Sequence, residues 1–178
     1  VFLNEGTWVL NNEQYMGVLT MTGGLTTGDG EIRALGGGEF TITATATGSE
    51  MGARINMYNA KTFRVEDGAA AADLLVSGNI VSGAAPSKFG AGRMELTGAN
   101  NTFSGGFNLE EGTLAASSVA DAGGAGSIGT GYLGINEGST FEYTGTGAET
   151  TTRQLWIDRG AGGTIDIVDA GAIVTFTP

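Results

Sequence analysis

The sequence contains no cysteine and no histidine among its 178 residues. Without cysteine, the chain has no disulfide framework, no thiolate nucleophile and no cysteine-ligated zinc site. Without histidine, it has no Ser-His-Asp triad and no histidine-ligated metal, and it lacks the residue that most often serves as a general base. The sequence therefore predicts a protein that is not an enzyme, with no catalytic residue, no metal site and no cofactor.

Positive charge is also scarce, because Lys61 and Lys88 are the only lysines and eight basic residues stand against 19 acidic ones. The net charge of −11 predicts that the chain does not bind nucleic acid or anionic membrane surfaces. No apolar run approaches the ~20 residues of a membrane span, so we expect no membrane insertion by this segment. The chain begins Val1-Phe2-Leu3, with neither an initiator methionine nor a signal peptide, which suggests a piece of a longer precursor.

Proline is rare, with 2 residues, whereas glycine is abundant, with 33. Glycine falls short of one third of the chain and has no G-X-Y period, which excludes a collagen helix. Hydrophobic residues make up 40% of the chain, and β-branched and aromatic residues recur throughout, unlike in disordered chains. The length predicts one folded domain spanning residues 1–178.

Short β-type runs separated by glycine turns dominate the sequence, and only residues 69–75 are compatible with a helical turn. Most runs alternate with period two: Phe141 and Tyr143 alternate with Thr140 and Glu142. This pattern predicts sheets with one buried face. The predicted strands cover residues 7–10, 17–21, 31–35, 39–46, 54–58, 62–65, 74–81, 93–97, 107–109, 113–116, 132–135, 140–143, 154–157, 164–168 and 172–177.

A corner motif recurs between these runs: an apolar residue, two polar residues ending in an acid, then glycine. It occurs at residues 3–6, 65–68, 109–112 and 135–138. The spacing of the first three corners is close to multiples of ~22 residues. A period of this length is typical of a solenoid and predicts roughly eight coils of three short strands in an all-β parallel fold. A sandwich or barrel is the rival fold, but it favours Asn-Gly hairpins, whereas the corners here are Gly-Gly, Thr-Gly and Ser-Gly.

Residues 88–114 read KFGAGRMELTGANNTFSGGFNLEEGTL. This stretch resembles the passenger-associated repeat of bacterial autotransporters in its lysine, its glycines, its asparagine, its aromatic residue and its Gly-Thr-Leu ending. Met94 stands where the family has leucine, which conserves volume. Residues 126–141 and 162–176 resemble the spacer coils that follow such repeats. Residues 1–87 share only the general pattern of short β-type runs and glycine turns.

The resemblance implies a right-handed parallel β-helix that is secreted and displayed on the surface of a Gram-negative-type bacterium. It divides the single solenoid into irregular coils (1–87), the repeat (88–114) and spacer coils (115–178). In that family the repeat is a scaffold that helps translocation and folding and carries no catalytic residue. The implied function is an extracellular structural solenoid, a passenger segment or fibre subunit.

Two sets of structural residues follow from this fold. The predicted turn glycines are Gly6, Gly68, Gly90, Gly92, Gly98, Gly105, Gly106, Gly112 and Gly138. A solenoid has two open ends with unpaired backbone groups, and natural solenoids cover them. We therefore expect end strands carrying Trp8 and Leu10, and Val174 and Phe176, to stack on further repeats or head-to-tail on another copy. Head-to-tail contact gives an open filament.

Three alternatives remain open. An adhesin-type binding module would use a projection at residues 68–73 or 82–86. Trp8 and Trp156 are further candidate anchors, although packing under a loop is the commoner arrangement of a lone tryptophan. A polysaccharide-active enzyme would use two carboxylates, and Asp158, Asp166 and Asp169 are close enough in sequence to share a face. Stacked acidic corners have the oxygen ligands that Ca²⁺ prefers, although we expect them to be solvated corners.

Overall fold

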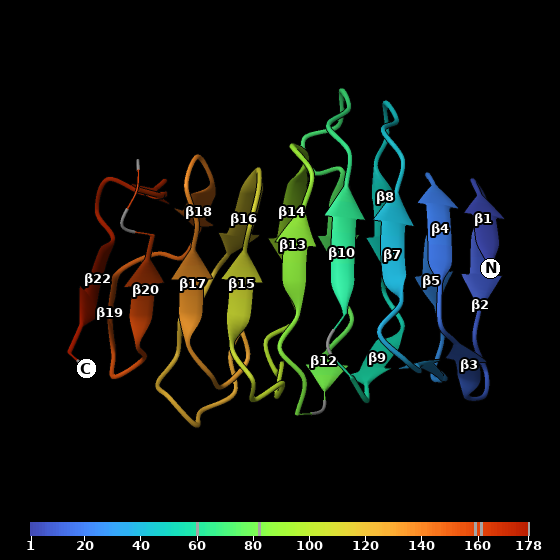
Figure 1. Ribbon diagram of the computed structural model, residues 1–178, viewed down its shortest axis with the longest axis horizontal. Coiled ribbons are helices and arrows are strands. Elements are labelled where there is room, and N and C mark those ends of the chain that lie inside the picture. The colour runs from blue at the N-terminus through green and yellow to red at the C-terminus, as the bar shows by residue number, and fades with distance from the viewer. Residues whose placement is uncertain (60, 82, 159, 161, 178) are drawn as a thin grey trace.

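The computed structural model describes residues 1–59, 61–81, 83–158, 160 and 162–177. In these residues the chain forms 22 β-strands and no helix. Strands far apart in the sequence lie side by side along the long axis of the molecule (Figure 1). All named strand pairs are parallel, so the chain is a β-solenoid of about 7 turns, slightly fewer than predicted.

Two long sheets of eight strands form two sides of the solenoid. In order, the first sheet contains β1 (Phe2–Asn4), β4 (Leu19–Thr22), β7 (Glu39–Ile42), β10 (Thr62–Val65), β13 (Ser87–Phe89), β15 (Phe107–Leu109), β17 (Leu133–Ile135) and β20 (Leu155–Ile157). The second contains β2 (Thr7–Val9), β5 (Leu25–Thr27), β8 (Ser49–Met51), β11 (Leu74–Val76), β14 (Arg93–Leu96), β16 (Thr113–Ala116), β18 (Thr140–Tyr143) and β21 (Thr164–Ile167).

The third side is a sheet only in part. Its N-terminal portion, the third sheet, contains β3 (Gln14–Met16), β6 (Glu31–Ala34), β9 (Arg54–Met57) and β12 (Ile80–Val81). Its C-terminal portion is the pair β19 (Ala148–Thr151) and β22 (Ile173–Phe176). Between them, the loops 97–106 and 117–132 replace the strand, so the prediction of three strands in every coil is wrong for these two coils.

All fifteen predicted segments contain a strand, but their bounds shift. The segment 39–46 ends as a strand at Ile42, and the segment 74–81 divides into β11 and β12. Six further strands were not predicted, namely β1, β3, β5, β8, β13 and β19. Most of these six are three residues long and largely polar, so they offer little alternation to detect.

The predicted helical turn at residues 69–75 is wrong, because β11 begins at Leu74 and no helix forms there. Asp73 explains the difference. Its buried carboxylate accepts hydrogen bonds from the backbone N–H of Gly68 and of Arg93, each at 2.8 Å. The side chain thus binds its own turn and the next coil, which fixes residues 68–73 as a turn leading into β11.

The core is one column of apolar side chains that runs through the coils. Because the strands pair in register, equivalent side chains stack: Met94 pairs with Leu114, and Leu114 with Phe141. Phe40 and Phe63 pack edge-on with ring centroids 5.5 Å apart. The next member of the ladder after Phe141 is Ile165, which is 37% exposed because its strand β21 pairs with β18 on one side only.

Buried cations, open ends and a polar groove

The predicted corner glycines are required for two different reasons. Five have positive φ: Gly6, Gly90, Gly106, Gly112 and Gly138. The other four lie so close to another coil that an added Cβ would sit 2.5 to 2.8 Å from a backbone atom: Gly68, Gly92, Gly98 and Gly105. Gly90 combines both constraints, with φ of +84° and an added Cβ 2.3 Å from the Val65 carbonyl oxygen.

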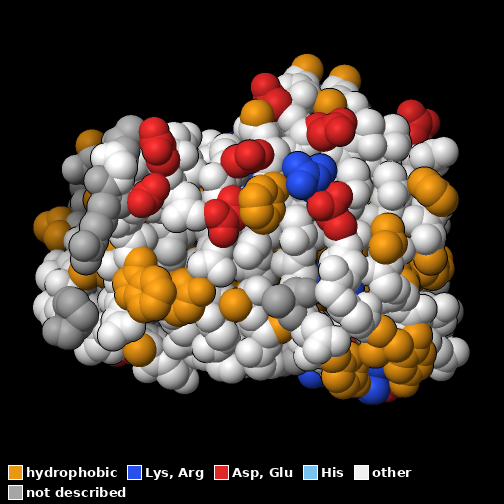
Figure 2. Space-filling view, viewed as in Figure 1, with side chains coloured by type: hydrophobic (Ala, Val, Ile, Leu, Met, Phe, Trp, Pro, Cys, Tyr) orange, Lys and Arg blue, Asp and Glu red, His pale blue; other side chains and the backbone are white. Residues whose placement is uncertain are grey.

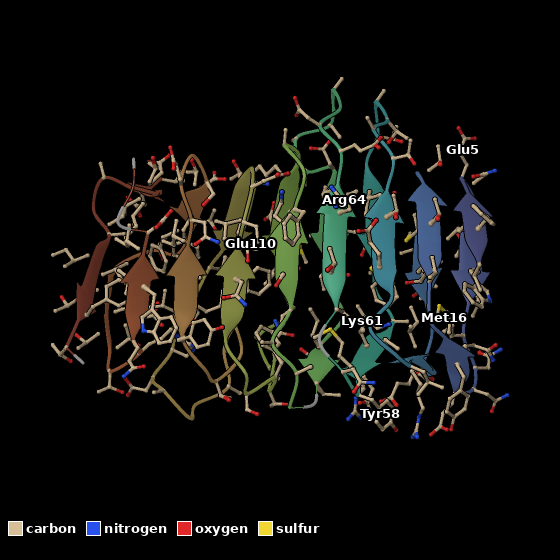
Figure 3. All side chains as sticks on the ribbon, viewed as in Figure 1. Glu5, Met16, Tyr58, Lys61, Arg64 and Glu110 are labelled. Atoms are coloured by element: carbon tan, nitrogen blue, oxygen red, sulfur yellow. The ribbon has the colours of Figure 1, made fainter. Side chains whose placement is uncertain are left out.

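Both lysines of the chain point inward, with exposures of 1% for Lys61 and 0% for Lys88. The Lys61 ammonium donates to the carbonyl oxygens of Gly17 and Leu35, at 3.0 and 2.9 Å, from the lower end of β10 (Figure 3). The Lys88 ammonium donates to the carbonyl oxygens of Gly90 and Glu111, at 2.5 and 2.8 Å. Lys61 therefore bonds to the two preceding coils, and Lys88 joins its own coil to the next one.

Arg153 is the third internal cation and is fully buried. Its guanidinium donates to the carbonyl oxygens of Val119 and Gly129, at 2.8 and 2.7 Å, and also to that of Gly131. These carbonyls belong to the long loop 117–132, which has no strand partner on the third side. Burial lowers the pKa of Arg153 to about 10, which keeps the group charged at neutral pH.

Asn101 likewise bonds to backbone groups in the coil whose third side is the loop 97–106. It is fully buried; its side-chain oxygen accepts from the backbone N–H of Ile80 at 2.6 Å, and its amide donates to the carbonyls of Gly98 and Ser127 at 3.0 and 2.6 Å. Buried backbone groups need partners, and here side chains supply them in place of a strand. The internal cations and Asn101 were not predicted as structural residues.

The internal cations make stability depend on pH. Burial lowers the pKa of Lys88 from 10.5 to about 8 and also lowers the pKa of Lys61. Between pH 8 and 10 the unfolded chain binds more protons than the folded one, so the free energy of unfolding rises with pH, by about 2 kcal/mol for Lys88. Burial and Glu149 raise the pKa of the Tyr143 hydroxyl to about 12. Above pH 10 this group lowers the free energy of unfolding as the pH rises, opposite to the lysines.

Urea unfolding at pH 7.5, 8.5, 9.5 and 10 measures this rise. Replacing Lys88 by methionine is expected to reduce it substantially, leaving the smaller contribution of Lys61. An equally steep rise in the variant would contradict the assignment to Lys88.

The two open ends consist of strands that pair on one side only: β1, β2 and β3 at one end and β20, β21 and β22 at the other (Figure 1). Trp8 is half-buried in β2, and Val174 and Phe176 are half-buried in β22, so these three lie at the ends as predicted. Leu10 differs, because it is 1% exposed and packs in the core, and its side chain is not part of the open end.

The acidic residues considered for catalysis do not form a metal cluster. Asp158 follows β20 of the first sheet, Asp166 lies opposite Glu142 in the second sheet, and the Asp169 carboxylate accepts from the backbone N–H of Gly171 at 2.8 Å. In the described part of the chain no three histidine, cysteine, aspartate or glutamate residues are grouped to hold a metal ion.

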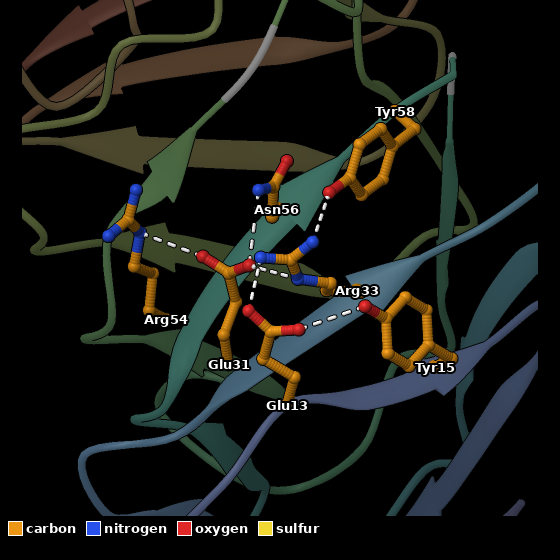
Figure 4. A network of polar contacts seen from close by, with 7 residues as sticks. All are labelled: Glu13, Tyr15, Glu31, Arg33, Arg54, Asn56 and Tyr58. Atoms are coloured by element: carbon orange, nitrogen blue, oxygen red, sulfur yellow. Dashed lines mark hydrogen bonds and ion pairs between the residues drawn. The ribbon is translucent and has the colours of Figure 1, made fainter.

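A polar groove of about 740 Å³ runs along the outer face of the third sheet, near the N-terminus. Its centre is Arg33 on β6, which bonds to Glu13, to Glu31 at 2.9 Å and to the Tyr58 hydroxyl at 2.6 Å (Figure 4). The Arg33 guanidinium lies 5.6 Å from the centroid of the Tyr15 ring and 5.8 Å from that of Tyr58. Figure 2 shows hydrophobic side chains around a basic one on the corresponding, lower right part of the surface.

The rest of the groove extends this network across three coils. Glu31 accepts from Arg54 at 3.1 Å and from the Asn56 amide at 3.1 Å. The Tyr15 hydroxyl donates to Glu13 at 2.9 Å, and this hydrogen bond raises the pKa of Tyr15. No single residue of the groove was singled out in the sequence, because its members come from three separate coils and only the stacking of these coils brings them together.

A second exposed feature is the aromatic platform formed by Tyr132 and Trp156. The two rings stack with centroids 4.6 Å apart and planes 12° from parallel, and Trp156 is 59% exposed. Trp156 therefore faces outward and is not packed under a loop, which was the commoner expectation for a lone tryptophan. The Tyr132 hydroxyl donates to Asn108 at 2.9 Å, which fixes the platform on the first sheet.

Residues 87–116 match the family model described as "Passenger-associated-transport-repeat". The match spans β13, β14, β15 and β16, and it includes Lys88 and Asn101. Searches among curated proteins and among solved structures gave no significant match. Within the described residues there is no helix with the length and apolar character needed to cross a membrane.

Proposed function

We propose, with the passenger-associated-transport repeat as the premise, that this chain is a structural passenger segment of a secreted or cell-surface bacterial protein of the autotransporter type. The observation that supports this best is the place of the repeat in the solenoid. Its strands β13 and β14 pair with β10 and β11 before the repeat, and β15 and β16 pair with β17 and β18 after it. The repeat is thus a set of coils within a longer rod of the same architecture.

The proposed work of this rod is mechanical and non-catalytic: it spaces and displays whatever the passenger carries. Every inner strand of the two long sheets pairs with a coil on each side, so deformation of one coil is shared with its neighbours. The two lysines add side-chain bonds between coils at the corners, and Arg153 adds them where the strand of the third side is absent.

We further propose that the open ends are covered by further coils, and that the 178-residue chain on its own stacks head-to-tail. Inward-facing side chains at the C-terminal end remain partly open to solvent, as Ile165 and Ile167 show at 37% and 36% exposure. Unpaired parallel strands that also expose apolar side chains are templates for another strand. A contact of this kind does not close on itself and builds a filament.

Negative-stain microscopy and sedimentation of the 178-residue chain at increasing concentration test this. We expect rods longer than the roughly 35–40 Å of one unit. An Ile167→Lys variant should lose them, because it places a charge in the end face, whereas Val168→Lys, at an exposed position beside it, should keep them. A chain that stays a single unit, with rapid hydrogen exchange in β21 and β22, would reject end stacking.

An adhesin-type binding module is the second candidate, and the polar groove and the aromatic platform favour it. The projections considered at first support it less. Asp73 binds the segment 68–73 to the next coil, and the segment 82–86 begins at a position outside the described residues. A polysaccharide-active enzyme is a weaker proposal, because Asp158 follows β20 of the first sheet whereas Asp166 lies in β21 of the second.

A further inference from the structure

We infer that the polar groove on the third sheet is a binding site for a neutral oligosaccharide. The site comprises the Tyr15–Arg33–Tyr58 stack together with Glu13, Glu31 and Arg54. This goes beyond the structural role proposed above, since a rod that only spaces needs no such groove.

The charges of the groove argue against an anionic ligand. Glu13, Asp29 and Glu31 line it with three carboxylates, against the two guanidiniums of Arg33 and Arg54. The Arg33 guanidinium already donates hydrogen bonds to Glu13 and Tyr58 and forms an ion pair with Glu31 through Nε. In a chain of net charge −11, a phosphate, sulfate or uronate ligand would meet repulsion without a free arginine fork to offset it.

The chemistry of the lining favours hydroxyl groups as the ligand's polar atoms. The walls offer both acceptors, on Glu13 and Glu31, and donors, on Arg54 and Asn56, and a sugar hydroxyl both donates and accepts. Arg54 makes one ion pair, through Nε, and its side chain is 58% exposed, so most of its donors face the solvent. No aliphatic side chain lines the groove to receive the apolar anchor of a peptide.

The two tyrosines supply the remaining element of sugar recognition, which is an aromatic surface for the C–H face of a pyranose ring. Tyr15 is 58% exposed and Tyr58 is 47% exposed, and the Arg33 network holds both in place. Side chains fixed before binding lose little rotamer freedom when the ligand arrives. Register places Tyr15, Arg33 and Asn56 on successive strands about 4.8 Å apart, so the groove presents a different side chain at each step.

The test is a titration of the isotopically labelled 178-residue chain, followed by amide chemical shifts. The probes are hexasaccharides of β-1,4-N-acetylglucosamine, β-1,4-glucose, α-1,4-glucose and β-1,4-mannose, with hexagalacturonate as the anionic probe. We expect at least one neutral probe to shift amides of β3, β6 and β9, and hexagalacturonate to bind at least tenfold more weakly. Absence of shifts with all four neutral probes, shifts centred on Trp156, or preference for the anion would overturn the inference.

Variants then link binding to the groove. Arg54→Gln and Tyr58→Ala are each expected to weaken binding at least tenfold. Arg64→Gln is the matched control, because Arg64 also makes one exposed ion pair, with Glu39 on the first sheet, and should bind like the unchanged chain. Unchanged thermal unfolding of Arg54→Gln confirms that its fold is intact, and unchanged binding by that folded variant would reject the site.

Discussion

Replacing Arg153 by methionine is expected to destabilise the protein by about 3–5 kcal/mol, since it leaves several buried carbonyl groups without a hydrogen-bond donor. The guanidinium is fully buried and donates to carbonyl oxygens of Val119, Gly129 and Gly131. Methionine has a similar length and no donor. Removing the charge recovers part of its desolvation cost, so the loss is smaller than the sum of separate bonds.

Urea unfolding at pH 7 measures this loss, and hydrogen exchange locates it. Protection should fall most in residues 117–132, whose carbonyls lose their partner. Arg64→Met serves as the control, because Arg64 makes an exposed ion pair that contributes at most about 1 kcal/mol. If Arg153→Met unfolds within 1 kcal/mol of the unchanged chain, the internal cation does not hold the loop.

The second large effect concerns Gly90, where alanine is expected to cost about 3 kcal/mol or more. Two terms add: positive φ costs a residue with a Cβ about 1–2 kcal/mol, and overpacking costs about 1–3 kcal/mol. The overpacking arises because the added Cβ would lie 2.3 Å from the Val65 carbonyl oxygen, and backbone cannot move aside as a flexible side chain does.

Gly138 separates these two terms. Its φ of +74° is close to that of Gly90, at +84°, yet no atom lies within 4 Å of an added Cβ. Gly138→Ala should therefore cost only about 1–2 kcal/mol, the conformational term alone. Equal losses in the two variants, compared by urea unfolding, would show that coil contact does not constrain Gly90.

The overall fold could be predicted from sequence because alternation and corner glycines are local signals. Phe141 and Tyr143 alternate with polar residues, and the strand forms where that pattern predicts. Within the repeat at 88–114, three of the four strands lie where the sequence predicted them, and β13 was missed. Strands such as β5 and β8 escaped prediction because three residues show at most one full alternation, and the neighbouring coils determine that they are strands.

The candidate sites were harder to predict because they depend on contacts between coils. Lys88 was visible only as part of a motif, and its burial follows from carbonyls at Gly90 and Glu111 that no spacing rule connects to a lysine. Arg153 bonds to loop carbonyls some 22 to 34 positions away, and no local pattern connects an arginine to them. The groove shows the same limit, since Tyr15, Arg33 and Tyr58 come together only through register.

The burial of both lysines has a consequence for the chemistry of the protein's exterior. Lysine amines are the usual targets of acylating reagents and of lysine-specific proteases, and here each is enclosed between two coils. The folded rod therefore offers these agents no lysine, however many copies are joined. Modification of Lys61 or Lys88 would instead record that a particular pair of coils had separated, so each lysine is a built-in reporter of local opening.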